Sequence, residues 1–182
     1  MVSVANRAEI ALCAGGYDRY NEDMAGKPFE TAETFGTPSV RQLSIFLENR
    51  VGALLRLFKV FEGSAVRVVG LAVSHTSDCA IVRLICDDSD TAVDLLRGRG
   101  YAFVETELLV VEIPQGQGLM SICSALLAAE VNIDYAYPLI SRPTGRAALA
   151  VRTDNLGTAA QILRARDFIL MSENDLGPGP PR

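Results

Sequence analysis

The chain has 182 residues and 49% of them are apolar, which is enough to bury one ordinary core or two small ones. Its net charge is −5, and an acidic chain lacks the positive field that attracts a phosphate backbone, so we expect no nucleic-acid partner. No segment approaches the roughly 20 consecutive apolar residues of a membrane span, so we expect no membrane association.

Residues 1–39 differ in composition from the rest of the chain. They are rich in Gly, Pro, Thr and charge, and they show no sustained hydrophobic period. We interpret them as an irregular arm ahead of the folded part. The last residues, 177–182, read "GPGPPR", which is typical of a disordered tail.

Between these ends the sequence repeats itself. Residues 91–101, "TAVDLLRGRGY", match residues 158–168, "TAAQILRARDF", at an offset of 67. Residues 43–55 match residues 109–121 more loosely at an offset of 66, which places Gly52 on Gly118. A period this long indicates a duplicated small domain rather than a solenoid, because each copy has room for several elements.

Each copy predicts the same elements in the same order. The first strand alternates apolar and polar residues, with Leu43, Ile45 and Leu47 in copy one and Leu109, Val111 and Ile113 in copy two. A helix follows, whose apolar stripe in copy one is Leu54, Leu57, Phe58 and Phe61. The matching stripe in copy two is Met120, Cys123 and Leu127, with Leu119, Ile122 and Leu126 beside it. Two β-rich runs around a turn, a second helix and a last strand complete each copy.

The order βαββαβ, found twice, is that of the ferredoxin-like unit. We therefore predict an α+β protein of two tandem units, residues 40–107 and 108–176, each an antiparallel sheet with helices on one face. The other face of the third strand carries Ile81, Arg83 and Ile85, which is apolar enough to need cover from another subunit or from the N-terminal arm. The joint near Glu107 is too short for a linker, which favours units placed side by side.

The ferredoxin-like fold hosts many functions, so function has to be argued from sites. RNA binding on the sheet would need stacking aromatic residues, and the third strands, residues 79–86 and 146–153, contain none. Cys79 and Cys86 fall on opposite faces of one strand and cannot form a simple thiolate pair. His75 has no nucleophile placed beside it by a local motif, and no P-loop or dinucleotide fingerprint is present. We expect no catalytic residue.

The remaining cysteines, Cys13 and Cys123, also lack a paired spacing, so we expect neither a metal nor a cofactor. The chain start shows no long apolar run of a secretory leader. Scattered thiols without such a leader predict a reducing compartment, and we expect a cytoplasmic protein.

Two short motifs carry a resemblance to a known family. Residues 47–61, "LENRVGALLRLFKVF", are similar to the strand–[DN]-x-P-G–helix signature of the ACT domain family, the regulatory modules of amino-acid biosynthetic enzymes. Residues 126–137, "LLAAEVNIDYAY", resemble the family's helix–"xxNI"–strand passage. The resemblance covers about residues 41–175 as two tandem copies, and it implies that a ligand such as an amino acid binds at an interface between ACT units.

In that family the ligand lies against the loop between the first strand and the first helix. A glycine there permits close backbone approach, and the helix N-terminus offers unpaired N–H groups to a carboxylate. The positions that the resemblance implies are Asn49, Arg50, Val51 and Gly52 in copy one, and Gln115, Gly116, Gln117, Gly118 and Asn132 in copy two.

The chain also departs from the family pattern. Val51 replaces the usual proline, and copy one has "VRV" at residues 66–68 where "NI" is expected. Either one site is degenerate, or a composite site uses the loop of one copy and the strand of the other. The plain structural alternative is that Gly52 and Gly118 only permit the turn while Asn49 caps the helix.

We therefore expect a non-catalytic regulatory protein, a homodimer, that binds an amino acid or a similar small metabolite. The alternative from another class is a structural or protein-partner module that uses the same fold for assembly without a ligand.

Overall fold

The computed structural model describes residues 38–75, 79–114 and 118–177, so the expected arm and tail lie almost entirely outside the described residues. In chain order the elements are β1 (Val40–Glu48), α2 (Ala53–Phe58), β2 (Val68–His75), β3 (Cys79–Cys86), α3 (Ser89–Gly98), β4 (Phe103–Glu112), α4 (Leu119–Ala128), β5 (Ile133–Pro138), β6 (Ala148–Thr153), α5 (Leu156–Ala165), β7 (Leu170–Met171) and the 3₁₀ helix η1 (Glu173–Leu176). This is the order βαββαβ twice, with β4 common to both copies.

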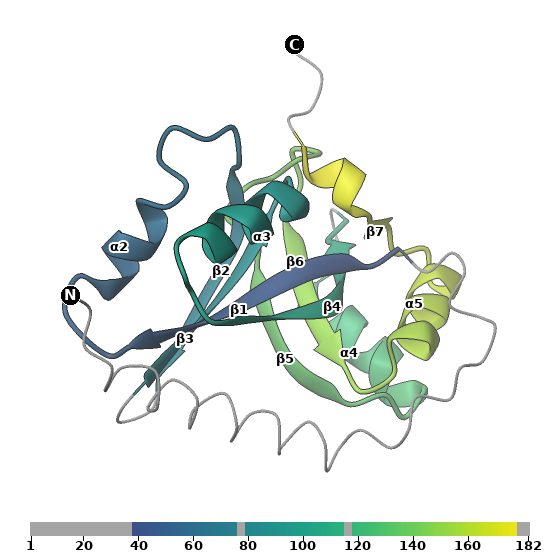
Figure 1. Cartoon of the computed structure of the whole chain (residues 1–182). Helices are drawn as coiled ribbons and strands as arrows, with labels where there is room; N and C mark the ends of the chain where they lie inside the picture. The colour runs from purple at the N-terminus through teal and green to yellow at the C-terminus, as the bar shows by residue number, and fades with distance from the viewer. Residues whose placement is uncertain (1–37, 76–78, 115–117, 178–182) are drawn as a thin grey trace.

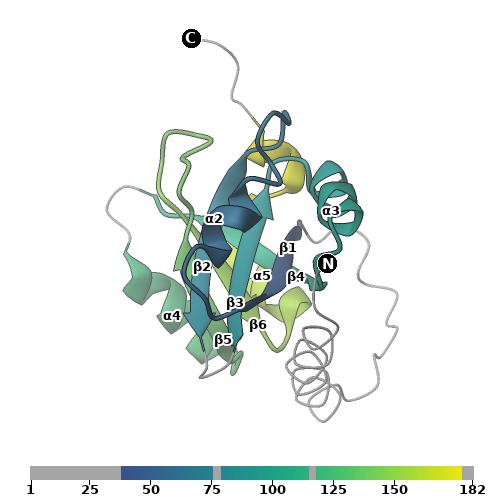
Figure 2. The same ribbon diagram turned by 60° about the vertical axis from the view of Figure 1, so that its left-hand side comes forward.

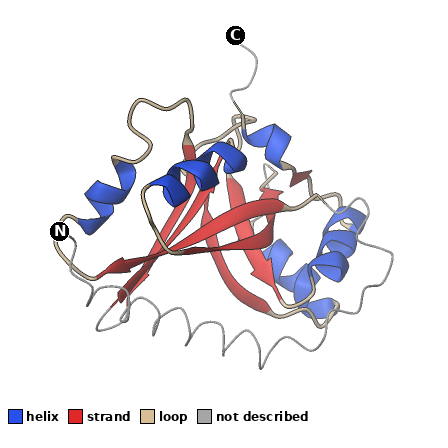
Figure 3. Cartoon of the chain, in the orientation of Figure 1, coloured by secondary structure: helices blue, strands red, loops and turns tan. Residues whose placement is uncertain are grey.

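The strands form one antiparallel sheet in the order β2-β3-β1-β4-β6-β5, with β7 also paired to β4. The first four strands of this order and the set β5-β6-β4-β7 each have the strand order of a ferredoxin-like unit. The sheet curls strongly, and the helices lie outside it (Figures 1 and 3). The predicted fold class, two tandem ferredoxin-like units of an α+β protein, is confirmed.

Strand β4 belongs to both units. Its first part pairs with β1 as far as Leu108, which lies opposite Val40, and its last part pairs with β6 from Leu109 onward. β7 continues the β1 side of β4, where Met171 lies opposite Val110. The change of partners lies next to Glu107, where the sequence predicts the joint. The exact unit boundaries, 40–107 and 108–176, stay a prediction.

Each unit packs its helices on the outer face of its part of the sheet. α2 and α3 cover β1–β3 and enclose a core that includes Leu57 and Leu84, whereas α4 and α5 enclose a core that includes Ile122 and Leu163 (Figure 2). The N-cap residues of α3 and α5 are Asp88 and Asn155, whose side chains accept hydrogen bonds from the backbone N–H groups three residues on. α2, α3, α4 and α5 therefore lie on the same, outer face of the sheet, as the repeat predicts.

The predicted stripe of the second-copy helix is wrong. Met120 and Leu127 are 77% and 78% exposed, and Cys123 is exposed, whereas Ile122 and Leu126 face the core. The repeat alignment equates Cys123 with Leu57, which is fully buried. The backbone differs at the two helix starts, with φ of 82° at Gly52 and −114° at Gly118. The buried positions of the second helix are therefore shifted by about one residue relative to the repeat alignment.

The inner faces of the two units pack against each other. Their shared core is the set Val40, Val69, Ile85, Leu108, Val110, Tyr137, Leu139, Ala148, Ala150, Met171 and Leu176. The face that the sequence predicts to need cover is therefore covered in part by the other unit of the same chain, rather than only by another subunit or by the arm. A curled sheet allows this because its concave side brings β2 and β5 together.

The two outer edges of the curled sheet meet at Gly70. It forms an isolated antiparallel bridge with Leu139, and the N–H of Ile140 donates to the carbonyl of Val69 at 2.8 Å. A Cβ placed on Gly70 would lie 2.9 Å from Cδ2 of Leu139 and 3.2 Å from Cβ of Ile85. Only glycine allows the edges to approach this closely. We call this contact the seam.

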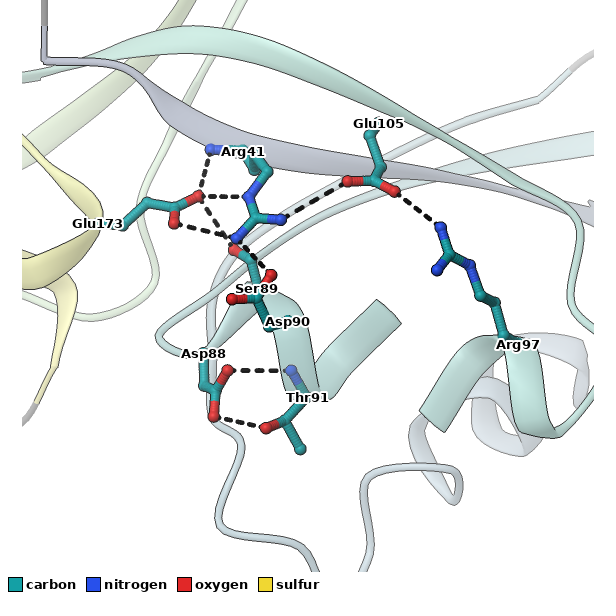
Figure 4. A network of polar contacts seen from close by, with 8 residues as sticks. All are labelled: Arg41, Asp88, Ser89, Asp90, Thr91, Arg97, Glu105 and Glu173. Carbon is teal, nitrogen blue, oxygen red and sulfur yellow. Dashed lines mark hydrogen bonds and ion pairs between the residues drawn. The ribbon is translucent and has the colours of Figure 1, made fainter. Parts of the chain in front are cut away.

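The C-terminal 3₁₀ helix is fixed by Arg41. The backbone N–H and the Nε of Arg41 both donate to Oε1 of Glu173, at 2.9 and 3.0 Å. The Nη2 of Arg41 lies 2.8 Å from Oδ1 of Asp90. Figure 4 shows Glu173 approaching Arg41 from η1 while Asp90 approaches from α3. One arginine on β1 therefore ties the end of the second unit to the first. Its guanidinium keeps the pKa of Glu173 below the ordinary value of 4.5, because the hydrogen bonds from Arg41 outweigh the opposing effect of burial.

We expect Gly70→Ala to destabilise the protein by about 1–3 kcal/mol, because the new methyl group has to displace Leu139 and Ile85 at the seam. Urea unfolding followed by circular dichroism measures this. The matched control is Gly98→Ala on α3, where an added Cβ meets nothing within 4 Å. The control should be as stable as the parent chain or up to about 1 kcal/mol more stable, because alanine is the better helix former. Equal stability of the two variants would contradict a tight approach at the seam.

We expect Glu173→Gln to cost about 1 kcal/mol near neutral pH, where the parent side chain is ionised and bound to Arg41. The folded pKa is lowered, so this contribution is present above the ordinary value of 4.5 and is lost as the pH falls below it. The difference in unfolding free energy between parent and variant should therefore shrink progressively as the pH falls below 4.5. Asp94→Asn, at an exposed position on α3, is the control for the loss of one carboxylate and should change the stability near neutral pH by less than about 0.5 kcal/mol. A difference in unfolding free energy between the parent chain and Glu173→Gln that stays the same in acid would refute the ion pair.

Candidate functional site

The first strand–helix junction, residues 49–52, forms a compact exposed turn. The backbone N–H of Arg50 donates to the carbonyl of Glu48 at 2.8 Å, and its Nε forms an ion pair with Oε2 of Glu48 at 3.0 Å. Asn49 is exposed directly after β1, and Val51 is 102% exposed. The charged group of this junction is thus already paired within the turn.

Gly52 is the N-cap residue of α2 and adopts the left-handed conformation, with φ of 82°. This conformation favours glycine, which explains the residue without reference to a ligand. The N-cap residue of α2 is Gly52 itself, and capping of this helix by the Asn49 side chain stays a prediction. α2 has only six residues, which limits the dipole that it can direct at an anion.

The second junction lies before α4. Gln115, Gly116 and Gln117 lie outside the described residues, and Gly118 is the N-cap residue of α4. Its backbone is extended, with φ of −114°, and an added Cβ would meet nothing within 4 Å. α4 has ten residues, no side chain caps it from the N-cap position, and no acidic residue stands in its first turn. Its start is therefore favourable for an anionic group.

An open pocket of about 410 Å³ lies beside the first turns of α4. Met120, Ser121 and Ser124 line it from α4, and Arg166 and Phe168 line it from the segment that follows α5. α4 and α5 lie next to each other in Figure 1. The pocket thus combines a cation, two hydroxyl groups and apolar surface next to a predicted ligand-binding glycine. Arg166 belongs to the repeated segment, but no local pattern indicates that it lies near Gly118.

The chain does not bring the two junctions together. β1 and β4 are antiparallel, with Val40 opposite Leu108 and Ile45 opposite Phe103. Residues 49–52 therefore leave one end of this ladder, and the chain after Glu112 leaves the other end. A site that uses both loops at once needs two copies of the chain.

Asn132 is exposed at the start of β5. Its backbone N–H donates to Oδ1 of Asp154 at 3.1 Å. In the first unit the backbone N–H of Arg67 donates in the same way to Oδ1 of Asp87 at 2.7 Å. Arg67 is therefore the counterpart of Asn132, so the "NI" position of copy one is occupied by Arg67 and Val68.

A buried polar network on the inner face was missed from the sequence. The Gln42 side chain is fully buried, donates through Nε2 to the hydroxyl of Tyr135 at 2.9 Å, and accepts from the hydroxyl of Tyr137 at 2.8 Å. Burial, and then the nearby Tyr135, raise the pKa of Tyr137, so its hydroxyl stays a donor. These bonds join β1 of the first unit to β5 of the second. Two features of the sequence could have indicated this network. Gln42 is a polar residue within a strand that alternates apolar and polar residues, and Tyr135 and Tyr137 are two residues apart and so share one face of β5.

Arg83 lies beside this network. Its guanidinium carbon stacks 4.5 Å from the centre of the Tyr135 ring, and Nη1 donates to Oγ of Ser74 at 2.7 Å. Its Nε is buried and has no hydrogen-bond partner among the described residues. Stacking on an aromatic ring compensates part of the cost of holding this cation between the units.

The described residues show no arrangement for redox or metal chemistry. Burial raises the pKa of Cys86 to about 12, so that residue remains a thiol. Within these residues, no group of three His, Cys, Asp or Glu side chains could hold a metal ion. His75 is exposed at the end of β2. No helix in the described part is long and apolar enough to cross a membrane.

Comparisons with known proteins agree with the architecture. A family model described as "ACT domain pair" matches residues 38–178. Protein BT0572 from Bacteroides thetaiotaomicron is similar in structure, with 27% sequence identity and a TM-score of 0.69, over 76% of this chain and 95% of that protein. The regulatory subunit of aspartate kinase from Thermus thermophilus has 10% identity and a TM-score of 0.49, over 71% of this chain and 92% of that one. No curated protein matches the sequence. With two ferredoxin-like units sharing one strand and a family match over most of its length, this chain belongs to the ACT domain pair family.

Proposed function

We propose that this protein is a non-catalytic regulatory protein of the cytoplasm that binds an amino acid or a similar small metabolite at ACT–ACT interfaces. The observation that carries the proposal is the pocket beside the start of α4 in a chain that belongs to the ACT domain pair family. The ligand-binding positions are the two junctions, residues 49–52 and 115–118, together with Asn132.

The second junction offers the better chemistry for a free amino acid. The exposed N–H groups at the start of α4 and the guanidinium of Arg166 attract the α-carboxylate. The hydroxyl oxygens of Ser121 and Ser124 can accept hydrogen bonds from the α-ammonium group. Met120 and Phe168 offer apolar surface to the side chain of the ligand. The groups that a zwitterion needs therefore come together around this pocket.

This pocket is open to solvent, and large exposed apolar residues lie near both junctions. Val51 and Leu55 are 102% and 62% exposed at the first junction, and Leu119 and Met120 are 54% and 77% exposed at the second. Contact with a second copy of the chain would bury these side chains and enclose the pocket. We therefore propose a homodimer in which the ligand lies at an interface between ACT units of the two copies.

The exposed apolar residues also favour a second candidate function. A structural or protein-partner module would use Val51, Leu55, Leu119 and Met120 for assembly and would need no ligand. The two functions differ in one respect that can be measured, because only the first requires Arg166.

We expect at least one of the 20 common amino acids, at millimolar concentration, to raise the melting temperature in a thermal-shift assay. A ligand at about 100 times its Kd stabilises by about 2.7 kcal/mol, and the melting temperature should rise by about 5–10 °C. Arg166→Gln should weaken that ligand about tenfold, because it removes a charge-assisted hydrogen bond. The matched control is Arg99→Gln, at the same place in the first repeat, which should leave the affinity unchanged. The absence of any shift with all the amino acids would count against the proposal.

We expect Gly118→Val to fold normally, because its backbone is extended and its Cβ has free space, and yet to lose the amino-acid response. Gly52→Ala should instead lose about 1–2 kcal/mol of stability because of its positive φ, and a response that survives in this variant would assign the ligand to the second junction. Sedimentation analysis of both variants separates the two candidate functions. A Gly118→Val chain that keeps its ligand but fails to assemble would support the partner module, and a monomeric parent chain would refute the homodimer.

A further inference from the structure

A second pocket lies at the seam, away from both strand–helix junctions. It has a volume of about 240 Å³. Arg67 and Val69 line it from the first unit, Ser141, Arg142 and Pro143 line it from the second, and Leu176 of η1 lines the remaining part. The three parts meet because the seam hydrogen bonds hold residues 139–141 against Val69.

Two polar side chains of this pocket, Ser141 and Arg142, have no polar side-chain partner among the described residues. Oγ of Ser141 is buried and has no hydrogen-bond partner among the described residues. Arg142 is exposed and forms no ion pair within the described part of the chain. Arg67 is ion-paired through Nε to Oδ2 of Asp87, at 2.9 Å. A buried hydroxyl group without a partner is costly, and it is expected where a ligand or an ordered water completes the site.

The apolar groups restrict the occupant further. Val68 of the first unit and Pro143 of the second unit line the pocket and are both half-buried, so each keeps apolar surface that an occupant can cover. A bare inorganic anion would leave this apolar surface in contact with water, whereas a branched alkyl group would cover it. The pocket is too small for a nucleotide-sized ligand by the usual range for such sites, roughly 300–1,000 Å³.

We propose that the seam pocket binds a small carboxylate with a short apolar body. The carboxylate accepts hydrogen bonds from Arg142 and from the hydroxyl of Ser141, and the alkyl part packs on Val68 and Pro143. This site is distinct from the amino-acid site at α4, and neither depends on the other.

Binding at this place acts on the joint between the units. The ligand touches residues on both sides of the hydrogen bonds from the N–H groups of Ile140 and Ser141 to the carbonyl of Val69, at 2.8 and 3.3 Å. A ligand that binds only when the seam is closed stabilises the closed seam, in proportion to its occupancy. The pocket is therefore placed to couple a metabolite to the relative position of the two ACT units.

The experiment uses the full chain and three probes that differ in one property each. Isovalerate carries both the carboxylate and the branched alkyl group, isoamyl alcohol lacks the charge, and inorganic phosphate lacks the alkyl group. Titration is followed by amide NMR, and hydrogen exchange of the Ile140 and Ser141 amides is measured with and without isovalerate. We expect saturable binding of isovalerate alone, with slower exchange at both amides when it is bound.

Arg142→Gln and Ser141→Ala should each weaken isovalerate about fivefold to tenfold, because each removes one hydrogen bond to the carboxylate. Arg166→Gln is the matched control and should leave isovalerate unchanged while weakening the amino acid. Conversely, Arg142→Gln should leave the amino-acid response intact, so failure of one site is distinguishable from failure of the other. The proposal is overturned if isovalerate does not saturate, if isoamyl alcohol or phosphate binds equally well, or if neither seam variant weakens binding. Unchanged exchange at Ile140 and Ser141 would overturn the coupling to the seam.

Discussion

The architecture depends on one strand that serves two units. β4 pairs with β1 as far as Leu108 and with β6 and β7 beyond it. Because the two units share this backbone, they cannot separate without breaking both ladders. The remaining freedom is the curl of the sheet, and the seam at Gly70 fixes it. The molecule therefore behaves as one curled sheet with two sets of outer helices rather than as two domains on a linker.

The curl also decides where ligands can bind. The concave side of the sheet, between the two units, is filled by apolar residues such as Ile85, Val110 and Met171. Beyond them Gln42 bonds both Tyr135 and Tyr137, which uses the polar groups of this face to join the units. The concave face is thus largely committed to holding the units together. The candidate sites lie instead on its margins, beside α4 and at the seam, where side chains from separate segments meet and polar groups are still available.

The direction of the shared strand separates the two junctions. Because β4 runs antiparallel to β1, the loops after these strands leave opposite ends of their ladder. The duplication therefore does not create a two-loop site within one chain, and a composite site requires a second copy. The two junctions also differ in detail, since Gly52 is left-handed before a six-residue helix and Gly118 is extended before a ten-residue helix. The two copies of the repeated pattern thus have different backbone conformations at their glycines. This difference is a physical reason for the two halves to bind a ligand unequally.

The sequence by itself determined the element order, the duplication and the family, because alternation in the strands and the repeat of Gly52 at Gly118 are local patterns. It also placed the joint next to Glu107, since no linker residues exist there. Only the tertiary structure decided which face of α4 is buried, because a one-residue change at the junction turned Cys123 and Met120 outward. It likewise decided that Arg67 takes the place of Asn132, and that Ser141 and Arg142 meet Arg67 at a pocket. These outcomes rest on contacts between residues far apart in the chain, and such contacts are set by sheet curl and register, which no local pattern encodes.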